Sequence, residues 1–139
     1  PYLLKLLQRF PGLRATIDHG AKPDIARGAW QPWADLIAVL ARETGVTCKL
    51  SGLVTEAGPD WTEASIRPYA DHLLAVFGAA RLMWGSDWPV VNLVGGYGPW
   101  WSFTQGWLAR LDATDAQHIM GGTARAFYRI TPGGGETSS

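Results

Sequence analysis

The sequence predicts an α/β fold in which three parallel strands are each followed by a helix. Three short apolar runs begin at Leu13, Val46 and Arg81, 33 and 35 residues apart, and each precedes a segment with helical periodicity. That spacing is too long for hairpins and fits βαβ units of roughly 30 residues. Successive units of this kind form a parallel sheet covered by helices. The repeat fits a (β/α)8 barrel, which uses about 250 residues in eight units, as well as an open sheet.

The first unit begins with a helix that ends at the Pro11-Gly12 pair, because apolar residues before this pair recur at helical spacing. A strand over residues 13–18 follows and ends in the polar sequence DHG. The next helical face then continues to a stop at Gly45. The two helical stripes consist of Leu3, Leu4, Leu7 and Phe10, and of Trp33, Leu36, Ile37 and Leu40.

The pattern then repeats twice. A strand over residues 46–51 ends at Gly52, and the helix after it closes at Gly78, which places Pro68 near its first turn. A third strand covers residues 81–86 and precedes a glycine-rich loop that runs through Gly98. The helical faces after these strands consist of Ile66, Tyr69, Ala70, Leu73 and Phe77, and of Trp100, Thr104, Trp107, Leu108 and Leu111.

The C-terminal part of the chain is expected to be helical and then disordered. A capping box from Thr114 to Gln117 opens a short helix, which the Gly121-Gly122 pair stops. Thr123 is positioned to cap a last turn that runs to about Tyr128. We therefore expect one folded unit over residues 1–130, followed by a disordered Gly- and Ser-rich tail over residues 131–139.

Composition excludes several classes of protein. The chain has 139 residues, 47% of them hydrophobic, and no net charge, so it can bury a core but offers no basic patch for a nucleic acid. No apolar stretch approaches the ~20 residues of a membrane span. The single cysteine, Cys48, excludes an internal disulfide, which is compatible with a cytoplasmic location. The chain begins at Pro1, inside the first helical pattern, so we expect it to be part of a longer polypeptide.

Polar side chains gather where the three predicted strands end. In a parallel sheet or barrel the carboxyl ends of the strands share one edge, and ligands bind there. The residues at these ends are Asp18, His19, Lys49, Ser51, Ser86 and Asp87. An imidazole, an ammonium group, two hydroxyls and two carboxylates at one edge predict a site for a small-molecule substrate.

Asp87 is the first candidate for a catalytic role. Trp84 and Trp88 flank it, and Pro89 removes a backbone N–H that the carboxylate could have capped. A carboxylate at the end of such a strand is suited to act as a general base toward water. The alternative is that Asp87 only caps a turn after the strand.

His19 and two lysines are further candidates. His19 could contact a substrate or a metal, or Asp18 could hold it in a structural role. Lys49 and Ser51 share one face of their strand, because strand side chains alternate, and are candidates for substrate binding at a barrel mouth. Lys22 either meets an anionic substrate group or is a loop charge. The chain contains no His-x-His or His-Glu-x-x-His pair, so a complete metal site cannot be built from it.

The tryptophans divide into two groups. Trp33 and Trp107 lie on helical stripes and are expected in the core. Trp88, Trp100 and Trp101 follow the third strand and are candidates for pocket walls, since large aromatic faces suit flat or sugar-like ligands.

Several of these segments together resemble a known family. The motifs are IDHGAKP at residues 17–23, KLSGL at 49–53, FG at 77–78, GSDWPV at 85–90 and GGTARAFY at 121–128. In this order they resemble the amidohydrolase-related family, and within it the branch of sugar-lactone hydrolases that includes fuconolactonases, rhamnonolactonases and pyrone-dicarboxylate lactonases. The resemblance covers residues 1 to about 130. It implies a (β/α)8 barrel, to which this chain supplies the last three strands.

The resemblance also implies roles for individual residues. Asp87 matches the aspartate that activates water, and His19 matches a histidine that contacts substrate or metal. Lys49 and Ser51 match residues that line the pocket. The cofactor is left open, as one divalent metal (Zn or Mn) or none; His19 and Asp87 are its ligands if a metal is present. The family's first-strand His-x-His is absent from this chain, so we expect the chain alone to be incomplete and inactive.

These observations predict a hydrolase that opens sugar-acid lactones or a related cyclic ester with water activated by Asp87. One alternative is a metal-dependent decarboxylase of the same superfamily. Another is a non-catalytic carbohydrate-binding module, in which Trp88, Trp100 and Trp101 stack on sugars. The sequence leaves the oligomeric state open.

Overall fold

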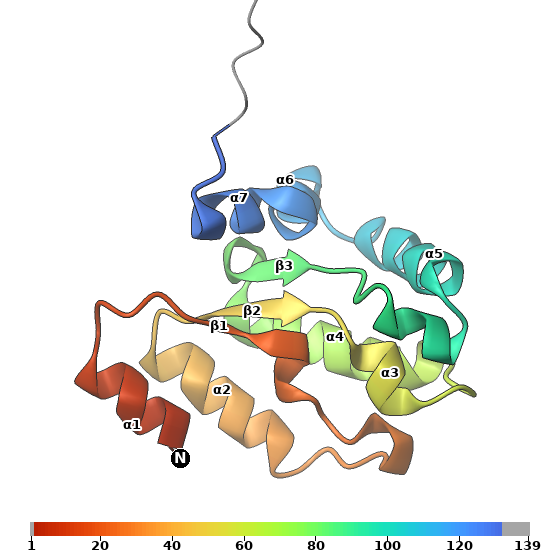
Figure 1. Ribbon diagram of the computed structural model, residues 1–139, viewed down its shortest axis with the longest axis horizontal. Coiled ribbons are helices and arrows are strands. Elements are labelled where there is room, and N and C mark those ends of the chain that lie inside the picture. The colour runs from red at the N-terminus through yellow and green to blue at the C-terminus, as the bar shows by residue number, and fades with distance from the viewer. Residues whose placement is uncertain (1, 132–139) are drawn as a thin grey trace, which may run out of the picture.

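The computed structural model describes residues 2–131, which form a three-stranded parallel sheet with helices around it. The strands β1 (Thr16–Ile17), β2 (Thr47–Leu50) and β3 (Leu82–Trp84) lie in the order β1-β2-β3, and all run in the same direction (Figure 1). Ile17 pairs with Cys48, and Leu50 pairs with Trp84. The predicted parallel α/β arrangement is confirmed, although each strand is shorter than its apolar run.

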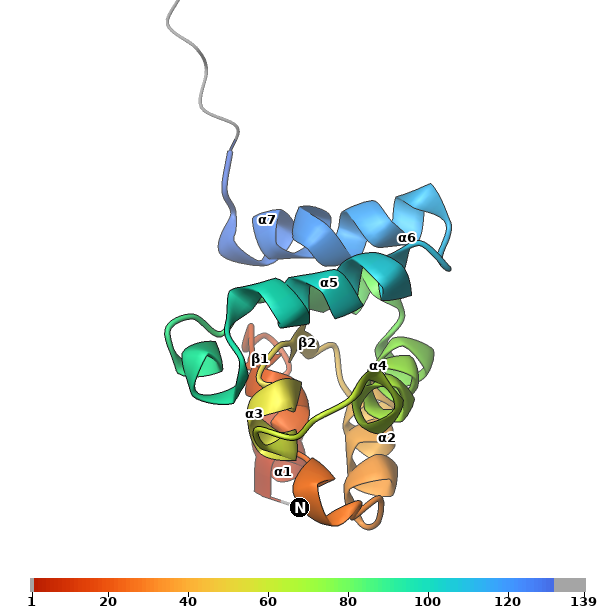
Figure 2. The ribbon, with the colours of Figure 1, turned by 90° about the vertical axis from the view of Figure 1, so that its right-hand side faces the viewer.

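The helices lie on both sides of this small sheet. They are α1 (Tyr2–Arg9), α2 (Trp33–Glu43), α3 (Leu53–Ala57), α4 (Glu63–Phe77), α5 (Tyr97–Leu108), α6 (Ala113–Gln117) and α7 (Thr123–Tyr128). Helices α1 and α2 lie on one side of the strands, and α6 and α7 lie on the other (Figure 1). Figure 2 shows α2 and α4 side by side, with α3 in front of the strands. None of the helices described between residues 2 and 131 is long and apolar enough to cross a membrane.

Short turns connect these elements. Four are 3-10 turns, η1 (Asp18–Ala21), η2 (Ile25–Arg27), η3 (Ala79–Arg81) and η4 (Val90–Val94), and one is a π-helical turn, η5 (His118–Gly122). The turns η1 and η4 follow β1 and β3, and α3 follows β2. These three segments therefore hold the polar residues at the carboxyl ends of the strands.

The hydrophobic core lies between the sheet and helices α2 and α4. Along β2, Cys48 and Leu50 are fully buried, whereas Thr47 and Lys49 on the opposite face are half-buried. Helices α2 and α4 contribute Ile37, Ile66 and Leu73 to the same core. Burial of a leucine or isoleucine of this kind stabilises the fold by roughly 1.5–3 kcal/mol, so this layer anchors β2 and the segment after it.

Helix α4 begins earlier than the hydrophobic stripe suggests. A capping box at its start joins Thr62 and Ser65, each side chain accepting a hydrogen bond from the backbone N–H of the other residue. Pro68 therefore lies inside the helix, in its second turn, rather than in the first turn, where a proline is tolerated best. Packing of the buried face of α4 outweighs the hydrogen bond that Pro68 cannot make.

The C-terminal helices also differ from the prediction. Asp112, rather than Thr114, caps α6 by accepting a hydrogen bond from the N–H of Asp115 at 2.9 Å. The Gly121-Gly122 pair does not stop the helix, because the π-helical turn η5 carries the chain directly into α7. Thr123 does not cap a turn; its hydroxyl donates to the carbonyl of Ala79 at 3.0 Å and so ties α7 to η3, the turn before β3. Most of the predicted tail, residues 132–139, lies outside the described residues.

Candidate active site

Side chains from all three strand ends meet beyond the carboxyl edge of the sheet. His19 follows β1, Ser51 follows β2 and Asp87 follows β3. The Nδ1 atom of His19 lies 2.8 Å from the Oγ atom of Ser51, and its Nε2 atom lies 3.7 Å from the Oδ1 atom of Asp87. The chain thus brings together three of the residues that the sequence placed at one edge. His19 and Asp87 are 24% and 14% exposed, so both are largely withdrawn from water but can be reached from it.

The backbone turns sharply at each of these strand ends. His19, Gly52 and Asp87 adopt left-handed conformations, with φ angles of 51°, 66° and 58°. Such a conformation costs roughly 1–3 kcal/mol at a residue other than glycine, although aspartate and asparagine tolerate it better than most. The surrounding packing holds His19 and Asp87 in this state, which aims their side chains toward each other across the end of the sheet.

Two glycines make room for the close contact between His19 and Ser51. A Cβ atom on Gly52 would lie 2.7 Å from the Cγ and Nδ1 atoms of the His19 ring. A Cβ atom on Gly85 would lie 3.2 Å from the Cβ atom of Ser51. A side chain at Gly52 is therefore incompatible with the observed position of the imidazole.

A second contact to Asp87 comes from α3. The hydroxyl of Thr55 donates to Oδ2 of Asp87 at 3.4 Å, while Oδ1 of the same carboxylate faces His19. Sequence reasoning missed Thr55, because a five-residue helix carries too few apolar positions to show a period. The available signal was the KLSGL motif, which places Thr55 three residues beyond a glycine at a strand end.

Lys49 reaches the same edge as half of an ion pair. Its Nζ atom lies 2.8 Å from Oδ1 of Asp18, the residue before His19. The hydrogen bond from Lys49 lowers the pKa of the Asp18 carboxyl below its usual value. The same hydrogen bond raises the pKa of Lys49, with a smaller contribution from Tyr128. The ammonium group at this part of the edge is therefore already paired with a carboxylate.

The remaining predicted substrate contacts are more exposed. Lys22 is 65% exposed and lies 3.8 Å from Oε1 of Glu56 in α3. Trp88 is 68% exposed and directly follows Asp87 in the chain. The structure places both residues around the edge, but neither makes a described contact with His19 or Asp87.

The structure separates the three tryptophans that were predicted as pocket walls. Trp100 is fully buried, and its indole N–H donates to the carbonyl of Gly85 at 3.0 Å, so its prediction as a pocket wall was wrong. Trp101 is half-buried and packs edge-on against Trp84 at 5.5 Å. Trp88 is the most exposed of the three. The helical stripe that contains Trp100 faces the core, which explains the difference.

The donors described here do not by themselves make up a metal site. His19 and Asp87 supply one nitrogen and one carboxylate, and between residues 2 and 131 no group of three or more His, Cys, Asp or Glu side chains is placed to hold a metal ion. Catalytic zinc usually takes three protein ligands and a water molecule.

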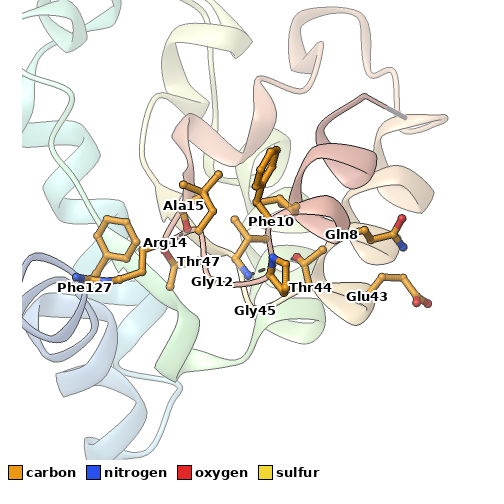
Figure 3. A pocket seen from close by; sticks show the side chains of 14 residues that line it. Gln8, Phe10, Gly12, Arg14, Ala15, Glu43, Thr44, Gly45, Thr47 and Phe127 are labelled. Atoms are coloured by element: carbon orange, nitrogen blue, oxygen red, sulfur yellow. Dashed lines mark hydrogen bonds between the residues drawn. The ribbon is translucent and has the colours of Figure 1, made fainter.

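A cavity of about 540 Å³ lies at the other end of the sheet, where the chain enters β1 and β2 (Figure 3). Its lining includes Phe10, Arg14, Thr44 and Phe127. The Arg14 guanidinium lies over the ring of Phe127, 5.2 Å from its centroid, so part of this wall is a structural contact. Because the chemistry of parallel α/β folds is found at the carboxyl ends of the strands, we assign this cavity no catalytic role.

Comparison with known proteins identifies the family. The sequence profile of the amidohydrolase family matches residues 1–130. The chain belongs to the amidohydrolase family. It is 45% identical over 134 residues to an L-fucono-1,5-lactonase from Burkholderia ambifaria, a match that covers 94% of this chain and 46% of that protein.

Solved structures of amidohydrolases share this fold. An amidohydrolase from Burkholderia multivorans with bound zinc superimposes with a TM-score of 0.84 at 37% identity, over 93% of this chain and 48% of that one. A Pseudomonas putida protein assigned as a 2-pyrone-4,6-dicarboxylic acid hydrolase gives a TM-score of 0.67 at 33% identity, over 93% of this chain and 47% of that one. The chain therefore spans about half the length of the amidohydrolases it matches. Its three parallel strands and their helices correspond to about half of the (β/α)8 barrel of these amidohydrolases.

Proposed function

We propose that this chain forms part of a hydrolase that opens a sugar-acid lactone, with Asp87 as the general base. The arrangement of His19 and Asp87 carries the proposal. Their facing atoms are 3.7 Å apart, which is too far for a direct hydrogen bond but allows one water molecule to lie within about 2.8 Å of both. The 45% identity to an L-fucono-1,5-lactonase supports the choice of a lactone as substrate.

In the proposed reaction, Oδ1 of Asp87 accepts a proton from this water as the water oxygen attacks the lactone carbonyl carbon. A C–O bond forms, and the carbonyl oxygen takes up the negative charge. The ring C–O bond then breaks, and the proton held on Asp87 passes to the leaving ring oxygen, which becomes a hydroxyl. The products are the open hydroxy acid and the regenerated Asp87 carboxylate.

His19 is the residue that orients the water or the reacting carbonyl in this scheme. Its Nδ1 atom is engaged by Ser51, so Nε2 is the ring atom that faces Asp87. Lys49, Lys22 and Trp88 surround these two residues as proposed substrate contacts. Ser51 is 2% exposed, and its hydroxyl contacts His19, so we reassign it from direct substrate binding to support of the imidazole.

The charges along this edge favour an uncharged, hydroxylated lactone over a dicarboxylate. The described residues place three carboxylates here, Asp18, Glu56 and Asp87, and Asp18 and Glu56 pair with the two lysines. An anionic substrate would have to displace one of these ion pairs or approach Asp87 directly. We therefore expect the full-length protein to open L-fucono-1,5-lactone faster than 2-pyrone-4,6-dicarboxylate.

The decisive experiment is the Asp87→Asn substitution in the full-length protein. We expect lactone hydrolysis to be abolished while circular dichroism and the melting temperature stay close to those of the unsubstituted protein. Asp60→Asn removes a carboxylate from an exposed loop and serves as the matched control, with activity retained. Hydrolysis at the unsubstituted rate by Asp87→Asn would overturn the proposal.

Two further assays separate the alternatives. Turnover of aromatic carboxylates with loss of CO₂, together with stoichiometric metal in the purified protein, would identify a decarboxylase instead. Sugar binding that survives Asp87→Asn but not Trp88→Ala would identify a carbohydrate-binding module. Burial of Trp100 removes one of the three rings on which that second alternative depended. A cytoplasmic location stays a prediction of the sequence.

A further inference from the structure

The segment between β2 and α3, residues 51–55, touches both of the side chains to which we assign the chemistry. Its first residue, Ser51, contacts Nδ1 of His19 at 2.8 Å. Its last residue, Thr55, donates to Oδ2 of Asp87 at 3.4 Å. His19 and Asp87 belong to the other two strand ends, so this corner supplies a side-chain contact to each of them.

The corner is anchored in the core of the molecule. Leu53 and Val54, which lie between the two hydroxyl residues, are 0% and 1% exposed. The carbonyl of Gly52 accepts a hydrogen bond from the N–H of Glu56 at 3.1 Å, which closes the first turn of α3. The left-handed Gly52 directs the chain from the strand into this turn. Packing therefore fixes the backbone positions from which Ser51 and Thr55 extend their hydroxyls toward His19 and Asp87.

Each hydroxyl contacts the atom of its partner that faces away from the reaction. When Ser51 donates its proton to Nδ1 of His19, the imidazole proton stays on Nε2, which faces Asp87. When Thr55 donates to Oδ2 of Asp87, Oδ1 keeps its lone pairs for the water. With Ser51 as the donor, the two contacts favour one tautomer of His19 and one orientation of the Asp87 carboxylate.

We infer that the β2–α3 corner is the positioning element of this site, in which Ser51 sets the tautomer and orientation of His19 and Thr55 sets the orientation of the Asp87 carboxylate. This inference rests on the proposed lactone hydrolysis. Ser51 and Thr55 are positioning residues, because they act through His19 and Asp87 and are not assigned any contact with substrate. Both roles depend on the side-chain hydroxyl. The hydroxyl of Ser51 belongs to a residue that is buried from solvent.

The test compares isosteric and conservative substitutions in the full-length protein, with L-fucono-1,5-lactone as substrate. Thr55→Val removes the hydroxyl and keeps the shape, whereas Thr55→Ser keeps the hydroxyl. We expect Thr55→Val and Ser51→Ala each to lower kcat by roughly 10-fold to 100-fold with KM within about twofold of the original, since misplaced reacting groups lose rate rather than ground-state binding. Thr55→Ser should restore kcat to within about threefold. Thr114→Val, the same change at an exposed helix position, is the control and should leave both constants unchanged.

A spectroscopic measurement tests the role of Ser51 without any turnover. Nitrogen-15 spectra of the protein labelled at histidine report which ring nitrogen of His19 carries the proton. We expect the Nε2–H tautomer in the original protein and a mixture of tautomers in Ser51→Ala. Unchanged tautomer populations in Ser51→Ala, or equal loss of kcat in Thr55→Val and Thr55→Ser, would overturn the inference.

The outcomes also separate this inference from the proposed function. If Asp87→Asn abolishes hydrolysis while Ser51→Ala and Thr55→Val leave kcat unchanged, the proposed function stands and the positioning role is wrong. If Asp87→Asn retains full activity, the proposed function itself fails, and the tautomer measurement alone then decides whether Ser51 controls His19.

Discussion

His19 and Asp87 face each other at 3.7 Å although they follow the first and the third strand of the sheet. Both residues hold left-handed backbone conformations, and His19 lies directly above Gly52 at the end of the strand between them. The site is therefore an assembly of three separate turns, each of which depends on close packing at the edge of the sheet. Substitutions in the full-length protein can probe the packing at this edge and in the core beneath it.

Gly52→Ala should impair catalysis more strongly than folding. The new Cβ atom would lie 2.7 Å from the His19 ring, and alanine is strained at a φ of 66°, so the imidazole has to move. We expect kcat to fall about 100-fold, with a loss of roughly 1–2 kcal/mol in the free energy of unfolding. Kinetics and urea denaturation measure the two effects. Gly45→Ala, where the Cβ atom would meet nothing within 4 Å, is the control; equal effects of both substitutions would contradict the role of Gly52.

Asp18 and Lys49 should stabilise the protein only within a range of pH. The pKa of Asp18 is lowered in the folded protein. Its contribution to the free energy of unfolding is therefore fully present above the pKa of the unfolded state, and it is lost as the pH falls through the pKa of the folded state. The pKa of Lys49 is raised in the folded protein. Its contribution to the free energy of unfolding is therefore fully present below the pKa of the unfolded state, and it is lost as the pH rises through the pKa of the folded state.

The experiment for this pair is a double-mutant cycle of Asp18→Asn and Lys49→Met, followed by urea denaturation. Because Asp18 is 62% exposed and solvent screens the pair, we expect a coupling energy below about 1 kcal/mol at pH 7. The coupling should be lost as the pH falls through the lowered pKa of Asp18, because the carboxyl then becomes protonated. A coupling energy that grows as the pH falls would contradict a stabilising role for the ionised Asp18 carboxylate.

Cys48 should be unreactive in the folded protein. Burial raises the pKa of its thiol to about 12, so the reactive thiolate is scarce at pH 8. We expect iodoacetamide to leave the peptide that contains Cys48 unmodified in the native protein and to alkylate it fully in urea. Mass spectrometry of that peptide measures both states. Rapid alkylation without denaturant would show that β2 is more accessible than the structure indicates.

Trp100 and Trp88 should respond differently to substitution. Trp100→Phe removes the donor to the carbonyl of Gly85 and leaves a small cavity around a fully buried ring, so we expect a loss of roughly 1–3 kcal/mol in stability. Trp88→Ala should change stability by no more than about 0.5 kcal/mol, because the side chain is exposed, and should raise KM if the indole contacts substrate. Thermal unfolding and steady-state kinetics measure both. A large loss of stability in Trp88→Ala would contradict its place at the edge of the site.

The sequence by itself determined the order of the elements and the choice of residues at the strand ends. The spacings in sequence between Leu13, Val46 and Arg81 match the length of βαβ units. Strands joined by connections of this length pair in parallel within one sheet. Placement of His19 and Asp87 at a common edge followed from that topology, because parallel strands end on the same side. Both inferences need only the hydrophobic periodicity of the sequence and the common direction of the predicted strands.

Only the tertiary structure decided which side chains touch. Ser51 turns to His19 because Gly52 is left-handed and has no Cβ atom. Thr55 reaches Asp87 because α3, a helix too short to show a period, crosses the end of the sheet. Trp100 lies in the core although it neighbours the loop after β3, and the helix runs through the Gly121-Gly122 pair because Ile119 and Thr123 are buried on either side of it. In each case packing between segments distant in the chain outweighs the local preference, and that energy cannot be read from neighbouring residues alone.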